Sequence, residues 1–175
     1  FGDVFVLRRL WAELGLDEIF APLAADPRLR FSRLDALRTM VFNRAIDPRS
    51  KLDTIEWANR DVLLPEAARL SETHLYRTLS WLTRVKPEAE RAIYDRIVKA
   101  RSKETQLVLF DTSGVHFETG EGPSLAQHGR PTRAPRGKKI VLVALVTTFD
   151  GWPICHHVFP GSTARSEEHT SELQS

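Results

Sequence analysis

Cysteine and methionine are almost absent from the sequence. Cys155 is the only cysteine among 175 residues, and Met40 is the only methionine. A single thiol excludes an internal disulfide framework and a multi-cysteine zinc site, and it fits a reducing, cytoplasmic environment. Because the chain begins at Phe1 and not at an initiator methionine, we expect it to be a piece of a longer protein.

Long apolar runs are absent as well. The longest covers seven residues, 140–146, whereas a membrane-spanning helix needs about 20. Asp3, Arg8 and Arg9 interrupt the first eleven residues, where a signal peptide requires an unbroken apolar segment. With 42% hydrophobic and 27% charged residues, the composition is that of a globular protein, and we expect neither secretion nor a membrane partner.

Helical patterns fill residues 1–105. Apolar residues recur at positions 4, 7, 11 and 14, and Gly15 follows where a helix would be capped. Later helices are expected to begin at capping or first-turn residues, namely Ser32, Ser50, Ser71 and Pro87. The helix after Ser32 should stop at Asp47-Pro48. We predict that it buries the face formed by Leu34, Leu37, Val41 and Ala45.

Strand patterns replace the helical ones from residue 106. Residues 107–110 form a short apolar run that ends at Asp111, which predicts a buried strand. Residues 139–149 are rich in β-branched side chains and lead into Asp150-Gly151, a strong hairpin signal, with 152–159 as the return strand. The sequence therefore predicts an α+β chain in which a helical bundle precedes three strands. Without a covering helix, that sheet would expose an apolar face and an edge.

Asp111 is the strongest candidate for a catalytic or metal-binding residue, and two interpretations of it remain open. A carboxylate on a buried sheet face needs a metal ion or hydrogen bonds to offset its desolvation, and carboxylate oxygens suit Mg²⁺. Alternatively, Asp111 ends the strand and its side chain caps a turn over residues 111–114. Glu118 would lie on the opposite face of a regular strand, so it is not an obvious second ligand.

The histidines and the cysteine offer weaker candidates. His156 and His157 are adjacent, so in a strand they point to opposite faces and cannot chelate one metal ion together. We expect one of them to be exposed and the other packed. His116 and His128 are isolated, and nothing in the sequence places a histidine beside Cys155.

A basic loop separates the first predicted strand from the hairpin. We define it as residues 127–139, a segment without an acidic residue that carries five basic ones: Arg130, Arg133, Arg136, Lys138 and Lys139. Such an arm could neutralise DNA phosphates, with strong salt dependence and little sequence preference. It could equally be a solvated loop that only keeps the protein in solution.

Four stretches, taken in order, resemble the DDE transposases encoded by bacterial insertion sequences, in the group with an RNase H-like catalytic domain. They are residues 43–58, 74–82, 107–118 and 138–164, and with their spacing the resemblance covers nearly all of residues 1–164. Asp111 matches the first metal-binding Asp of the family, and Phe117 and Glu118 complete the local pattern. The chain departs from the family at Ser162, where Asn is usual, and at Gly114, where a small hydroxyl residue is common.

The resemblance implies different roles for two parts of the chain. Residues 1–105 would bind duplex DNA and pair two protomers into a homodimer. Residues 106–164 would form the first three strands of an incomplete RNase H-like α/β domain. Within the helical part, Arg77 and Arg84 would be available to phosphates, although we predict the stripe from Leu75 to Leu82 to be core.

The resemblance also implies the chemistry of the parent protein. With Mg²⁺ or Mn²⁺, an activated water cuts the end of the element, and the freed 3′ hydroxyl attacks target DNA. The family needs a second Asp and a Glu, which would lie beyond Ala164. We therefore expect a bacterial, cytoplasmic protein piece that is inactive as given and holds the metal ion only weakly through Asp111.

Residues 165–175 have a different origin in our interpretation. Their sequence, RSEEHTSELQS, resembles the in-frame translation of a sequencing-library adapter, so no function is inferred from them. Two alternatives to the transposase hypothesis stay open for the rest of the chain. One is a non-catalytic DNA-binding module that uses the basic loop, and the other is a helical interaction protein with a small sheet attached.

Overall fold

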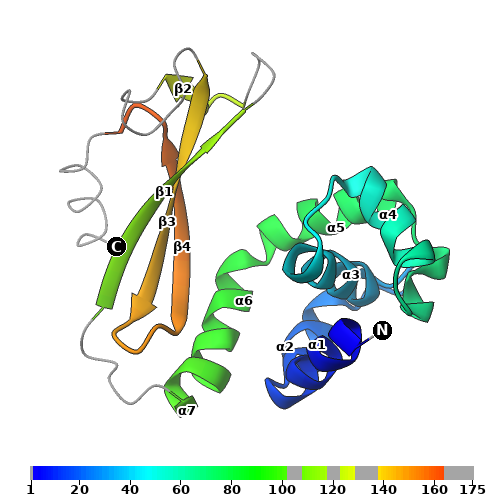
Figure 1. The fold of residues 1–175 in the computed structure, drawn as a ribbon. Helices are drawn as coiled ribbons and strands as arrows, with labels where there is room; N and C mark the ends of the chain where they lie inside the picture. The colour runs from blue at the N-terminus through cyan, green and yellow to red at the C-terminus, as the bar shows by residue number, and fades with distance from the viewer. Residues whose placement is uncertain (1, 102–107, 118–122, 129–137, 164–175) are drawn as a thin grey trace. The chain divides into compact units, whose positions relative to one another are not determined.

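The computed structural model describes residues 2–101, 108–117, 123–128 and 138–163 (Figure 1). The chain divides into two compact units, Phe1–Ile93 and Tyr94–Ser175. Helices precede strands, so the fold class is α+β, as the sequence predicts. None of the helices in the described ranges has the length and apolar character needed to cross a membrane.

The first unit consists of helices only. Their bounds are α1 Gly2–Glu13, α2 Leu16–Ala24, α3 Arg33–Ile46, α4 Lys51–Arg60, the 3₁₀ helix η1 Pro65–Arg69, α5 Glu72–Arg84 and α6 Lys86–Ile93.

Helix ends lie where the local sequence signals place them. Gly15 adopts a left-handed conformation with φ of 65° and separates α1 from α2. The Ser32 hydroxyl accepts a hydrogen bond from the Asp35 amide at 3.1 Å, and the Ser50 hydroxyl accepts one from the Asp53 amide at 3.2 Å. These caps satisfy backbone donors that the first turn of each helix leaves unpaired, and they confirm the predicted helix starts.

The buried face of α3 differs from the prediction. Val41 is 41% exposed and Ala45 is also exposed, whereas Met40 and Asn43 are buried. The reason is that α3 contacts α1, α2, α4, α5 and η1, so it buries a wide face that includes polar residues. An apolar stripe alone could not locate that face, because Asn43 is buried through hydrogen bonds to the chain after the helix and to α4.

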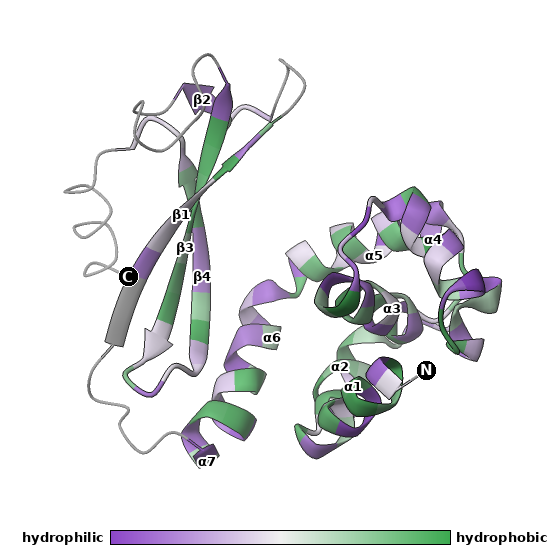
Figure 2. Cartoon of the chain, viewed as in Figure 1, coloured by the Kyte–Doolittle hydropathy of each residue, from purple (hydrophilic) through white to green (hydrophobic). Residues whose placement is uncertain are grey.

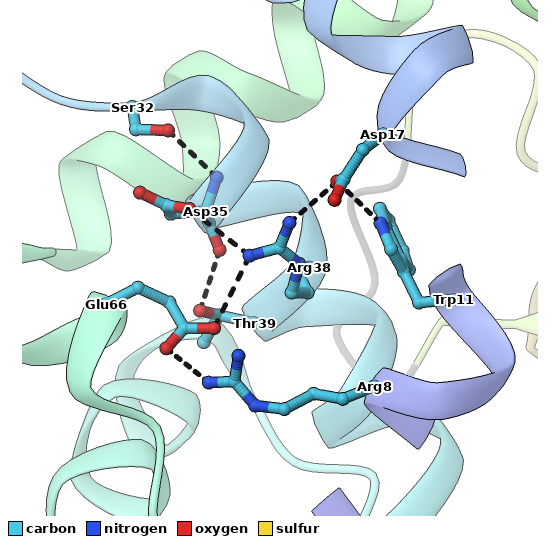
Figure 3. Close-up of polar contacts among 8 residues, drawn as sticks. All are labelled: Arg8, Trp11, Asp17, Ser32, Asp35, Arg38, Thr39 and Glu66. Atoms are coloured by element: carbon cyan, nitrogen blue, oxygen red, sulfur yellow. Dashed lines mark hydrogen bonds and ion pairs between the residues drawn. The ribbon is translucent and has the colours of Figure 1, made fainter. Parts of the chain in front are cut away.

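Ion pairs join four elements of the first unit (Figure 3). Arg38 of α3 contacts Asp17 of α2 at 2.6 Å and Glu66 of η1 at 3.5 Å. Asp17 also accepts a hydrogen bond from the Trp11 indole of α1 at 2.8 Å, and Arg8 lies 2.5 Å from Glu66. Since each of these charged groups faces an opposite charge, the network links the four elements to one another.

The second unit begins with a π-helical turn, Tyr94–Val98, and the short helix α7, Lys99–Arg101. Its strands are β1 Val108–His116, β2 Gln127–His128, β3 Lys139–Thr148 and β4 Pro153–Pro160. All pairings are antiparallel, and β3 lies between β1 on one side and β4 with β2 on the other (Figure 1).

The predicted hairpin is present, but the first strand is longer than predicted. Gly151 has φ of 87°, and the Thr148 amide donates to the Trp152 carbonyl at 2.8 Å to close the turn. β1 does not end at Asp111 but continues to His116, with Gly114 opposite Leu142. Pairing with the long central strand keeps residues 111–114 extended, so the interpretation of Asp111 as the cap of a turn is wrong.

The two faces of the sheet differ in exposure. Ile140, Leu142 and Ala144 lie on one face and are fully buried. On the other face Val115, Leu145 and Val158 are 49%, 44% and 45% exposed. Figure 2 shows the hydrophobic colour running along β3. The prediction of an exposed apolar face is therefore met only in part, because Val141, on the same face as Leu145, is 9% exposed.

Candidate functional site

Asp111 lies near the middle of β1 with its side chain exposed. It pairs with Leu145 of β3, which in turn pairs with His156 of β4, so the three residues form one row across the same face of the sheet. The prediction that Asp111 is a costly buried carboxylate is wrong, because the side chain is in contact with solvent. A carboxylate there can meet a hydrated metal ion without prior desolvation.

The strand that carries Asp111 lies at an edge of the described sheet. β1 pairs with β3 along all of its residues, from Val108 opposite Thr148 to His116 opposite Ile140. Within the described ranges no strand pairs with its other edge. Asp111 therefore stands where a further strand could place a second acidic side chain beside it.

The remaining acidic and histidine candidates do not gather around Asp111. Glu118 lies outside the described residues, while the amide of the preceding Phe117 donates to the Lys139 carbonyl at 3.0 Å. His156 and His157 lie on opposite faces, as predicted, and His157 is the more exposed. Across the part of the chain that the structure describes, no three His, Cys, Asp or Glu side chains are close enough to hold a metal ion.

Cys155 does have a histidine beside it, contrary to the sequence analysis. The Cys155 sulfur lies 3.7 Å from Nε2 of His157. Both residues belong to β4, and residues two apart in a strand share a face. The spacing 155 to 157 in a predicted strand was therefore the signal that could have found this pair.

The basic loop is described only at its ends. Arg130, Arg133 and Arg136 lie outside the described residues. Lys138 and Lys139 are half-buried, and Lys139 opens β3 opposite His128 of β2. The first two residues of the loop thus form a short strand that the sequence did not predict.

The turn after β4 includes Ser162. The Ser162 hydroxyl donates to the side-chain oxygen of Gln127, and the Gly161 amide donates to the Leu125 carbonyl at 3.3 Å. Gly161 is buried against the backbone of Ile140 and Gln127. Serine therefore serves this turn, and glycine is required by the close approach of the two chain segments.

A second candidate site lies on the first unit, where sequence analysis had singled out only Arg77 and Arg84. A pocket of about 450 Å³ is bounded by one face of α5 and by the segment that leads into α3. Arg33, Arg77 and Arg84 all line it. The predicted core stripe of α5 is buried only at Leu75, because Leu79 and Leu82 are half-buried. The buried face of α5 is instead formed by Leu75, Thr78 and Trp81. The signal for the pocket was the polar spacing at positions 73, 77, 80 and 84.

No protein-family model matches the chain, and no curated protein or solved structure matches it either.

Proposed function

We propose that the chain is part of a DDE-type DNA transposase and that Asp111 is a ligand of its catalytic divalent metal ion. The observation that carries the proposal is the position of Asp111: an exposed carboxylate in the middle of an edge strand, in a sheet whose strands follow the order β1, β3, β4. The ordered sequence resemblance supports it independently of this geometry.

The residues fit part of a metal site. Carboxylate oxygen is a hard donor that suits Mg²⁺ or Mn²⁺, and Asp111 supplies one such side chain. When bound, the metal would stabilise charge on a phosphodiester and on an attacking oxygen. Asp111 would orient the cation toward DNA. Because one carboxylate cannot hold a pair of cations, we expect weak metal binding by this chain and no strand cleavage.

Metal binding at Asp111 can be tested with paramagnetic Mn²⁺. In NMR spectra of the full chain, sub-stoichiometric Mn²⁺ should broaden amide signals around Asp111 in β1 and around its partner Leu145. Asp111→Asn should abolish this broadening, whereas Asp3→Asn, which changes an exposed carboxylate in α1, should leave it intact. Equal broadening in the wild type and in Asp111→Asn would exclude Asp111 as a ligand.

Activity is tested by a strand-cleavage assay with Mg²⁺ or Mn²⁺ and terminal inverted-repeat DNA. We expect no cleavage. Metal-dependent cleavage that Asp111→Ala abolishes would contradict the inactivity that we propose and would strengthen the assignment of Asp111.

The alternative is a non-catalytic DNA-binding module. The observation in its favour is the concentration of five basic residues and no acidic residue in the basic loop. Both functions predict salt-dependent DNA binding, so binding alone does not choose between them. The metal titration distinguishes the two functions, because a non-catalytic DNA-binding module gives Asp111 no role in cation binding.

A further inference from the structure

The pocket on α5 combines positive charge with aromatic surface. Thr73, Arg77, Ser80 and Arg84 follow one another on a single face of the helix, and Phe31 and Arg33 close the opposite side. No carboxylate lines this pocket. The site lies wholly within the first unit, so it is separate from Asp111.

The charge of the pocket is only partly balanced. Arg33 lies 3.4 Å from Asp26, and a hydrogen bond from Arg28 lowers the pKa of Asp26. Arg77 and Arg84 are exposed and form no ion pair with any residue that the structure describes. The pocket therefore presents two uncompensated guanidinium groups to solvent.

Aromatic rings hold two of the arginines in place. The guanidinium carbon of Arg77 lies 5.4 Å from the centre of the Phe31 ring, and Phe31 stacks on His74 at 4.2 Å. The backbone amide of Ser71 donates to Nδ1 of His74 at 3.2 Å, which fixes that ring in turn. A guanidinium stacked through its face keeps its N–H edge available for a ligand, and the stacking reduces the rotamer entropy lost on binding.

The Arg33 side chain is fixed in a similar way. Its guanidinium carbon lies 5.7 Å from the centre of the Trp81 ring, and the Trp81 indole donates to the Leu23 carbonyl at 3.2 Å. Arg33 is only 14% exposed, so it forms a rigid, positively charged wall and not a mobile surface arm.

We infer that this pocket binds the phosphate group of a nucleotide unit, with the base stacked on Tyr76. Planar guanidinium groups match the oxygen pairs of a phosphate. The Ser80 hydroxyl donates to the Tyr76 carbonyl at 3.2 Å, and on rotation it can donate to a third phosphate oxygen instead. Tyr76 also lines the pocket and is 52% exposed, which leaves a ring face for a base. The same chemistry could come from a free nucleotide or from a single-stranded nucleic acid.

The experiment titrates the full chain with inorganic phosphate, with dAMP and with an oligothymidylate of about twelve nucleotides. Side-chain Nε–H signals of arginine in ¹H–¹⁵N spectra are followed. Signals of Arg77 and Arg84 should shift with all three ligands. The double variant Arg77→Gln/Arg84→Gln should weaken binding of each ligand at least tenfold, whereas the control Arg9→Gln/Arg60→Gln, which neutralises two exposed arginines of α1 and α4, should not.

Tyr76→Leu separates the two parts of the inferred ligand. It should weaken binding of dAMP and of the oligonucleotide about tenfold and leave phosphate binding unchanged. Tighter binding of the oligonucleotide than of dAMP would indicate a nucleic acid strand, and comparable binding would indicate a free nucleotide. Either result supports the pocket. Wild-type affinity in the Arg77→Gln/Arg84→Gln variant would overturn it, and neither outcome depends on metal binding at Asp111.

Discussion

Gly161 shows how a single missing side chain fixes the position of a turn. A Cβ atom at this residue would overlap the carbonyl oxygens of Ile140 and Gln127, and backbone atoms cannot move away cheaply. We expect Gly161→Ala to destabilise the second unit by about 1–3 kcal/mol, as overpacking does elsewhere. Hydrogen exchange of the β3 amides measures this loss without interference from the first unit.

The matched control for this substitution is Gly2→Ala. An added Cβ at Gly2 would meet no atom within 4 Å, and alanine favours a helix such as α1. Exchange of the β3 amides should therefore stay at its wild-type rate. If Gly161→Ala leaves that rate unchanged too, the close approach of the turn to β3 is not as the structure places it.

Arg38 illustrates what sequence reasoning cannot reach at the scale of one residue. Its partners, Asp17 and Glu66, lie 21 and 28 positions away, where no periodicity links them. Oε1 of Glu66 is enclosed and, within the described part of the chain, accepts no hydrogen bond, so the guanidinium 3.5 Å away offsets its burial. Such pairs become visible only when the packing of α2, α3 and η1 is known.

The connection between α3 and α4 depends on a buried amide. The Asn43 side chain is 2% exposed, donates to the Asp47 carbonyl at 2.8 Å and accepts from the Thr54 hydroxyl at 2.9 Å. It also accepts from the Arg49 amide at 3.3 Å. We expect Asn43→Ala to lower the free energy of unfolding by about 2–3 kcal/mol, because it leaves buried polar groups without partners.

Urea unfolding followed by tryptophan fluorescence measures this effect, since three of the four tryptophans, Trp11, Trp57 and Trp81, lie in the first unit. Asn59→Ala is the control: Asn59 is an exposed residue of α4 whose side-chain amide donates to the Ile55 carbonyl at 2.8 Å. Removal of the Asn59 side-chain amide should change the free energy of unfolding by less than about 0.5 kcal/mol. Equal effects of the two substitutions would show that the α3–α4 connection does not depend on the Asn43 bonds.

Elements that depend on neighbouring residues were predicted well. The caps at Ser32 and Ser50 and the hairpin at Asp150-Gly151 arise from hydrogen bonds between residues a few positions apart in the chain. The local sequence is therefore sufficient to predict them. The length of β1 and the buried face of α3 were predicted wrongly. Both are decided by a partner distant in sequence, β3 for the strand and several helices for α3.

At the scale of the whole molecule, the order of helices before strands was predictable because the period of the apolar pattern changes once, near residue 106. The candidate site was predictable only in part. The sequence singled out Asp111 as a candidate, but it did not predict the exposure of this side chain, since burial depends on how many layers cover the sheet. The arginine pocket escaped prediction because Arg33 and Arg84 are brought together by the fold.

The distribution of charge, and not its sum, should govern DNA binding by the whole chain. The formal net charge is only +2, yet the basic loop concentrates five positive charges. Glutamine at Arg130, Arg133, Arg136, Lys138 and Lys139 removes this concentration. It should reduce the salt dependence of duplex binding, measured by fluorescence anisotropy as the slope of log K against log salt, by up to about four units.

A charge-matched variant distinguishes contacts between the basic loop and DNA from a general effect of net charge. It carries glutamine at five exposed arginines outside the loop, namely Arg9, Arg28, Arg60, Arg69 and Arg91. Both variants have the same formal charge, so a response to net charge alone would change both slopes equally. If the loop contacts phosphates, the loop variant loses more slope than the charge-matched variant, because counterions are released only where basic side chains meet the DNA backbone. Equal slopes in the two variants would remove the basic loop from the DNA interface.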